Sequence, residues 1–179
     1  MSEQRRSILP TLILSTMVVV IVGWFALLVL STPEGPPEAV VNKLSLEVVQ
    51  EVAVAHTLSP RVRVDGKTDQ WIVGSGTVVA GFDTKDPIPY EDFGGTLSFS
   101  LPSAQLLDVD GKVLHLENDA GEQLNLPANL DPLEGQMDIA LRHEAVVAGV
   151  MRQAETQLLR HLRSRFKPLG YFVEAAPGN

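Results

Sequence analysis

The chain contains no cysteine. This absence excludes a disulfide framework and any chemistry that needs a thiolate, so a folded domain here must be held together by packing alone. Positive charge is also scarce. Residues 31–179 contain 12 Lys+Arg against 21 Asp+Glu, a formal charge of −9. Because phosphate groups are bound by local positive charge, this balance argues against nucleic acid and anionic lipid as partners.

Charge is absent altogether from residues 8–30, a run of 23 residues. As a helix this run would extend about 34 Å, which is enough to cross a hydrocarbon core of about 30 Å. Arg5 and Arg6 precede it, and such a basic flank favours a cytoplasmic N-terminus. The run is too long for the core of a secretory signal peptide, although cleavage after Ser31 stays an alternative. We predict a single-pass signal anchor at the cell membrane, with residues 31–179 outside the cytoplasm.

The predicted layout follows from this anchor. A spacer with three prolines comes after the span and is expected to be stiff and to hold the rest of the chain off the bilayer. The parts are a cytoplasmic tail at 1–7, the transmembrane helix at 8–30, the spacer at 31–41, one exported domain at 42–174 and a tail at 175–179.

Alternation of apolar and polar residues predicts that the middle of the exported part is mostly an antiparallel sheet. Its central strand is rich in β-branched residues and is expected to be kinked at Gly74-Ser75-Gly76. The expected strands are 44–54, 62–64, 71–81, 96–101, 105–109, 112–117 and 122–126, with turns at Asp65-Gly66, Asp110-Gly111 and Asp119-Ala120-Gly121.

From Asp138 apolar residues recur every three or four positions, which predicts one long amphipathic helix that ends before Pro168. This helix is expected to cover one face of the sheet and a last strand at 171–173 to pair back into it, giving an α+β domain. The net charge is +3 for residues 139–179 and −12 for residues 31–138. The expected apolar face consists of Ile139, Val146, Val147, Val150, Ala154, Leu158, Leu162 and Phe166.

No metal-binding motif is complete, and we predict neither a metal nor a cofactor. His143-Glu144 opens like a zinc-protease motif, but Val147 stands where the second histidine is required. Three aspartates near two predicted turns resemble a calcium site in composition only, because hairpin turns favour Asp-Gly. These aspartates are Asp108, Asp110 and Asp119, and the histidines without a partner at ligand spacing are His56, His115 and His161.

No catalytic residue is assigned either, and the sequence favours a protein that is not an enzyme. Ser75 lies between two glycines but precedes a strand, unlike the serine of a nucleophile elbow, which precedes a helix. Asp83 follows the central strand and is expected to initiate a turn. Tyr90, Glu91 and Asp92 are near in sequence, yet nothing in the pattern fixes their geometry.

Three motifs in a fixed order carry a resemblance. They are Gly-x-Val-x-Ala-Gly-x-Asp at 76–83, Leu-Ser-Phe-Ser-Leu-Pro-Ser-Ala at 97–104 and Leu-Gly-Tyr-Phe-Val at 169–173. With the N-terminal anchor, this order resembles the bacterial membrane-anchored family called domain of unknown function 4230, over about residues 42–174. The resemblance implies a single-pass protein with an exported α+β domain and supplies no reaction or site residue.

Three hypotheses of function follow. The first is a non-enzymatic, envelope-associated interaction module that binds a protein partner through the basic helix face of Arg160, Arg163 and Arg165. The second is a small-ligand or lipid-binding domain with a cavity between the helix and the strand face of Leu97, Phe99 and Leu101. The third is a hydrolase that uses Asp83 or Ser75.

Overall fold

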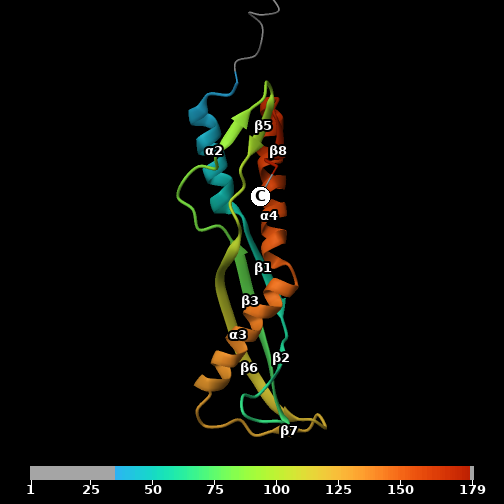
Figure 1. The fold of residues 1–179 in the computed structure, drawn as a ribbon. Coiled ribbons are helices and arrows are strands. Elements are labelled where there is room, and N and C mark those ends of the chain that lie inside the picture. The colour runs from blue at the N-terminus through green and yellow to red at the C-terminus, as the bar shows by residue number, and fades with distance from the viewer. Residues whose placement is uncertain (1–34, 178–179) are drawn as a thin grey trace, which may run out of the picture. The chain divides into compact units, whose positions relative to one another are not determined.

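A five-stranded antiparallel sheet lies at the centre of the computed structural model, which describes residues 35–177 (Figure 1). The long strand β3 (Gln70–Gly81) pairs along one side with β1 (Ala53–Leu58) and then with β2 (Arg61–Arg63). Its other side pairs with β6 (Gln105–Asn118), whose far end pairs with β7 (Gln123–Leu124). Every second residue in the middle of β3 is buried, so one face of this sheet is turned to the core.

A second, three-stranded sheet stands beside the end of the first. It consists of β4 (Tyr90–Asp92), β5 (Thr96–Phe99) and β8 (Phe172–Ala175). The pair β4–β5 is antiparallel, whereas β5 and β8 run parallel. The last described strand, β8, therefore completes a sheet whose other two strands come from the middle of the chain.

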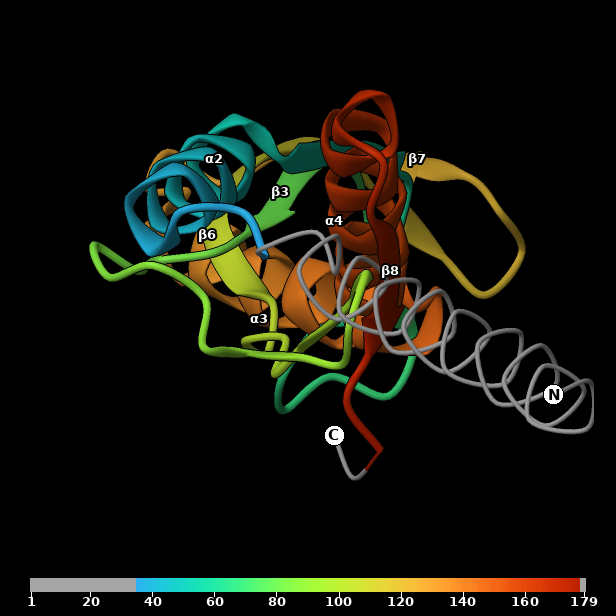
Figure 2. The same cartoon turned by 90° about the horizontal axis from the view of Figure 1, so that it is seen from above.

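Three α-helices complete the fold of residues 35–177. The helix α3 (Asp131–Val147) packs against β3 and β6, and α4 (Val150–Phe166) packs against β1, β3 and β8. The first described helix, α2 (Glu38–Glu51), packs against α4, and Figure 2 shows β8 lying along α4. A 3₁₀ turn (Lys167–Leu169) follows α4. The α+β class, the antiparallel sheet and the helical C-terminal region are confirmed.

The predicted strand at 44–54 is wrong, and so is the end of the spacer at residue 41, because residues 38–51 form α2. This segment contains two periodicities at once. Leu44, Leu46 and Val48 alternate as in a strand, whereas the residues that the structure buries, Val41, Ser45, Val48 and Val49, follow the spacing of one helix face. Packing of that face decides between the two patterns, and β1 begins only at Ala53.

The predicted hairpin turn at Asp110-Gly111 is also wrong, because β6 runs without interruption through both residues. A Cβ on Gly111 would collide with the Cδ1 of Leu141 in α3. Glycine is thus present to let the helix approach the strand, not to turn the chain. The other two predicted turns, Asp65-Gly66 and Asp119-Ala120-Gly121, are present in the structure. Gly66 and Gly121 both have positive φ.

The single helix predicted from Asp138 is two helices, and the first begins seven residues earlier, at Asp131. The Oδ1 of Asn129 accepts a hydrogen bond from the Asp131 N–H, and Pro132 follows in the first turn, as helix starts favour. The break lies at Gly149, which has φ 69° and so cannot continue a right-handed helix. The chain therefore turns at Gly149 between two amphipathic helices, which the sequence pattern had predicted to be one.

The predicted anchor at residues 8–30, the tail at 1–7 and the start of the spacer lie outside the described residues. Within residues 35–177 no helix has the length and hydropathy that a membrane crossing requires.

Candidate functional site

The helix α3 has two apolar faces, and only one of them is covered. Its inner face, formed by Leu133, Met137, Leu141 and Ala145, is buried against the sheet. On the outer side Ile139 is 69% exposed, Val146 57% and Val147 75%. The sequence pattern had assigned these three residues to the covered face, and this assignment is wrong. Exposed apolar side chains gathered on one helix face are typical of a docking surface.

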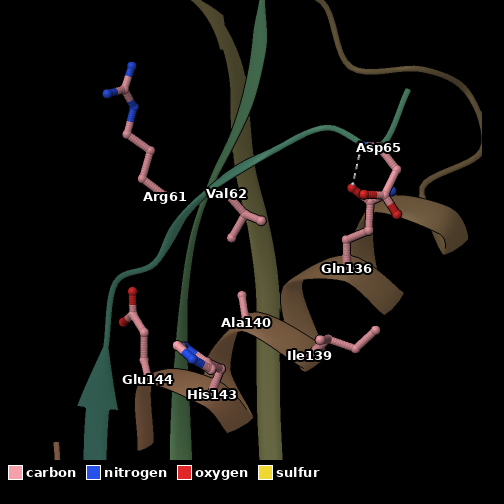
Figure 3. Close-up of a pocket in the computed structure, with 8 residues that line it drawn as sticks. All are labelled: Arg61, Val62, Asp65, Gln136, Ile139, Ala140, His143 and Glu144. Carbon is pink, nitrogen blue, oxygen red and sulfur yellow. Dashed lines mark hydrogen bonds between the residues drawn. The ribbon is translucent and has the colours of Figure 1, made fainter. Parts of the chain in front are cut away.

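A groove of about 420 Å³ runs between this outer side and the strand β2 (Figure 3). Its lining includes the apolar side chains of Val62, Ile139 and Ala140. At one end the Asp65 N–H donates a hydrogen bond of 3.0 Å to the Oε1 of Gln136, which ties the turn after β2 to α3. His143 and Glu144 lie at the other end. The groove is therefore apolar inside and polar at both ends.

Arg61 also borders the groove but points away from it in Figure 3. Its guanidinium forms an ion pair with Glu117 and lies 4.5 Å from the ring centroid of Trp71, over which Arg63 also stacks. These contacts hold Arg61 on the opposite side of the strand. The positive charge nearest to the groove is thus already engaged within the sheet.

The outer side of α3 continues past Gly149 onto α4. A second hollow, of about 480 Å³, extends from Val147 along α4 to Arg160 and is lined by polar side chains on that helix. Arg152 and Arg160 are exposed there and form no ion pair with any residue of the described chain. We call the whole surface the elbow surface; it comprises Ile139, His143, Val146, Val147, Arg152 and Arg160.

The predicted basic face is only partly available. The Nε of Arg163 donates a hydrogen bond of 3.0 Å to the carbonyl oxygen of Val173, which holds β8 against α4. Arg165 binds both carboxylate oxygens of Glu51 at 2.9 and 3.1 Å and so joins α4 to α2. Of the three predicted arginines, Arg160 is the one that the fold leaves to a partner.

The residues considered for catalysis are kept apart or engaged by the fold. Asp83 is exposed in the loop after β3, and Ser75 is half-buried within that strand. The Oδ1 of Asp92 accepts hydrogen bonds from the N–H groups of Gly94 and Gly95, so this carboxylate shapes a turn. A nucleophile, a base and a group that orients the base do not come together here, although acid–base catalysis requires such contacts.

The candidate metal ligands are dispersed in the same way. Between residues 35 and 177 no three His, Asp or Glu side chains are grouped so that they could hold a metal ion. Asp119 accepts a hydrogen bond of 2.7 Å from the Nε1 of Trp71, and the Nε2 of His115 lies 3.6 Å from a Glu117 carboxylate oxygen. His143 belongs to the elbow surface, while His161 is exposed on α4.

The predicted ligand cavity is occupied by the protein itself. Leu97 and Phe99 are fully buried, and the ring centroid of Phe99 lies 5.5 Å from that of Phe166 and 5.7 Å from that of Tyr90. Leu101 borders a hollow of about 160 Å³ between the end of β5 and α4. This region holds the small sheet to α4.

Tyr90 offers a test of this packing. Burial raises the pKa of its hydroxyl above the usual value, and the carboxylates of Glu38 and Asp92 add to the rise. Above the usual tyrosine pKa of about 10 the unfolded chain releases this proton while the folded chain retains it. The native state then binds more protons, so the free energy of unfolding is expected to fall as the pH rises above about 10.

Urea unfolding between about pH 9 and pH 11 measures this effect. The wild-type protein is expected to lose stability more steeply over this range than the variant Tyr90→Phe, which has no proton to release. Equal slopes for the two proteins would contradict the assignment of the loss to Tyr90.

No family model, curated protein or solved structure matches this chain.

Proposed function

We propose that this protein is a single-pass membrane protein whose exported domain is a non-enzymatic interaction module. The elbow surface is proposed to bind a segment of a partner protein that carries both apolar and acidic side chains. The membrane part of the proposal rests on residues 8–30 and their basic flank. The resemblance to the domain of unknown function 4230 stays a prediction that agrees with this arrangement.

The observation that carries the proposal is the second apolar face of α3. Its inner face already supplies the contacts that hold α3 to the sheet, so Ile139, Val146 and Val147 add nothing to the core. Burial of such apolar surface by a partner would contribute about 25 cal/mol of binding free energy for each Å² removed from water. An apolar segment laid along the outer face would recover this free energy.

Charge indicates which kind of segment fits. Arg152 and Arg160 continue the apolar face along α4 and make no ion pair with the described residues. Residues 31–138 carry a net charge of −12, so a basic partner would be attracted to other surfaces instead. Carboxylates on the bound segment would meet the two free guanidinium groups, which steers association and sets the orientation of the segment.

The first test replaces Ile139 and Val147 by glutamate in the full-length protein. Capture of the partner is expected to weaken by at least about tenfold, because two buried apolar contacts are lost and two charges oppose the acidic segment. The fold is expected to remain, since both side chains are exposed. Capture is measured in intact cells with a photocrosslinker placed at His143, which belongs to the same surface.

The matched control is Leu126→Glu, which also places a carboxylate on a partly exposed apolar position but lies in the loop before α3. It is expected to leave capture unchanged. Mass spectrometry of the crosslinked peptide then identifies the bound segment. A basic segment, or equal loss of capture in the control, would refute the proposed elbow surface.

A further inference from the structure

The most exposed aromatic side chain of the described chain is Phe172, which is 77% exposed at the start of β8. Its N–H donates a hydrogen bond of 2.9 Å to the carbonyl oxygen of Gly95 in the turn between β4 and β5. Phe93, in the same turn, is 63% exposed, and Leu169, just after α4, is 48% exposed. We call these three residues, Phe93, Leu169 and Phe172, the aromatic tip.

The backbone of the aromatic tip is fixed, so its exposure is not the result of a loose loop. Gly94 and Gly95 both have positive φ, and the Oδ1 of Asp92 accepts a hydrogen bond from each of their N–H groups. Gly170 also has positive φ and turns the chain from α4 into β8. The fold therefore holds Phe93 and Phe172 outward on defined turns.

The surroundings of the tip combine apolar surface with positive charge. A hollow of about 490 Å³ is lined by Phe172 together with Tyr171, Val173, Arg163 and Lys167. Lys167 is exposed and forms no ion pair with another described residue. Aromatic and aliphatic side chains flanked by a cation are the combination that proteins place at the boundary of a lipid bilayer.

The start of the described chain indicates which bilayer the aromatic tip can meet. Figure 1 shows the first residues of α2, the β4–β5 turn and the C-terminal end of α4 at the same end of this unit. Five residues, 31–35, separate the predicted span from Pro36, and even fully extended they cover only about 18 Å. With the proposed anchor in the bilayer, this length limits how far Pro36 can lie from the membrane surface.

We infer that the aromatic tip inserts into the interface of the bilayer in which the chain is anchored. The inference rests on the proposed anchor at residues 8–30 and is independent of the elbow surface. The tip is expected to favour a zwitterionic over an anionic surface, because Glu38, Glu91 and Asp92 near the tip oppose anionic lipid. The phenyl rings then lie among the upper acyl chains, and Lys167 lies at the level of the phosphates.

The absence of cysteine allows a direct test on the full-length protein. Single variants Phe93→Cys, Leu169→Cys and Phe172→Cys are spin-labelled and reconstituted into phosphatidylcholine vesicles. The matched control is Gln123→Cys, an exposed site on β7, which Figure 1 shows at the opposite end of the unit. Collision of each label with oxygen, which concentrates in lipid, is compared with collision with a water-soluble nickel chelate. Circular dichroism verifies that each labelled variant is folded.

The ratio of oxygen to nickel collisions is expected to be at least about threefold higher at the tip labels than at the control. Flotation of the vesicles tests the anchor separately. If the protein floats but tip and control labels give the same ratio, the tip inference is overturned and the anchor stands. Tip labels shielded from both reagents would indicate a protein contact and also overturn it. A protein that does not float at all refutes the anchor and, with it, the tip inference.

Discussion

The variant Gly76→Val is expected to lower the free energy of unfolding by about 3 kcal/mol, since it overpacks the centre of the fold. A Cβ at this position would lie 2.5 Å from the Cδ1 of Leu141 and 2.7 Å from the carbonyl oxygen of Asp110. The side chain of Leu141 could move, but the backbone of β6 cannot move without breaking the pairing of β3 with β6. Urea unfolding followed by circular dichroism measures the loss.

A second glycine provides the control. Gly135 lies on the outer side of α3, and a Cβ added there would meet nothing within 4 Å. Gly135→Ala is therefore expected to stabilise the protein by about 0.5–1 kcal/mol, because it restricts the unfolded chain and favours the helix. If both substitutions had the same small effect, the close approach of α3 to the sheet would be refuted.

The second large effect is expected for Phe166→Ala, with a loss of about 3–5 kcal/mol. Phe166 is fully buried at the end of α4, and its ring lies 5.5 Å, centroid to centroid, from the ring of Phe99 in β5. Removing it leaves a cavity between α4 and the small sheet and deletes an aromatic pair. The midpoint of urea unfolding is expected to fall accordingly.

Phe172→Ala is the matched control, since it removes the same side chain from an exposed position only six residues further along the chain. Its effect on stability in detergent solution is expected to stay within about 0.5 kcal/mol. Comparable losses in the two variants would show that the small sheet is not held by the Phe99–Phe166 contact.

How far the sequence predicts this fold depends on whether local pattern and tertiary packing agree. They agree in β3, where β-branched residues alternate between a buried and a half-exposed face. They disagree at residues 38–51, where a strand-like alternation coexists with a helix face, and at Gly111, where an Asp-Gly pair serves the approach of Leu141. In both places a distant element decides the outcome, and no local window contains that element.

The sequence predicted only part of the candidate site. Periodicity identified Ile139, Val146 and Val147 as apolar helix positions but could not show that the inner face of α3 is complete without them. One signal was available. On a helical projection Ile139 and Val146 lie opposite Met137 and Leu141, so a single covered face could not contain all four. The commitment of Arg163 and Arg165 to contacts with Val173 and Glu51 depends on tertiary structure alone.

The parallel pairing of β5 with β8 sets the order in which this domain can be completed. Leu97 is paired with Val173, a partner 76 positions later in the chain, and α2 packs against α4, which begins 99 positions after α2 ends. During synthesis, the N-terminal elements must remain unfinished until the final strand arrives. A chain truncated before Phe172 would lack the parallel partner of β5, so degradation of incomplete copies would act on an open sheet edge that the finished domain does not present.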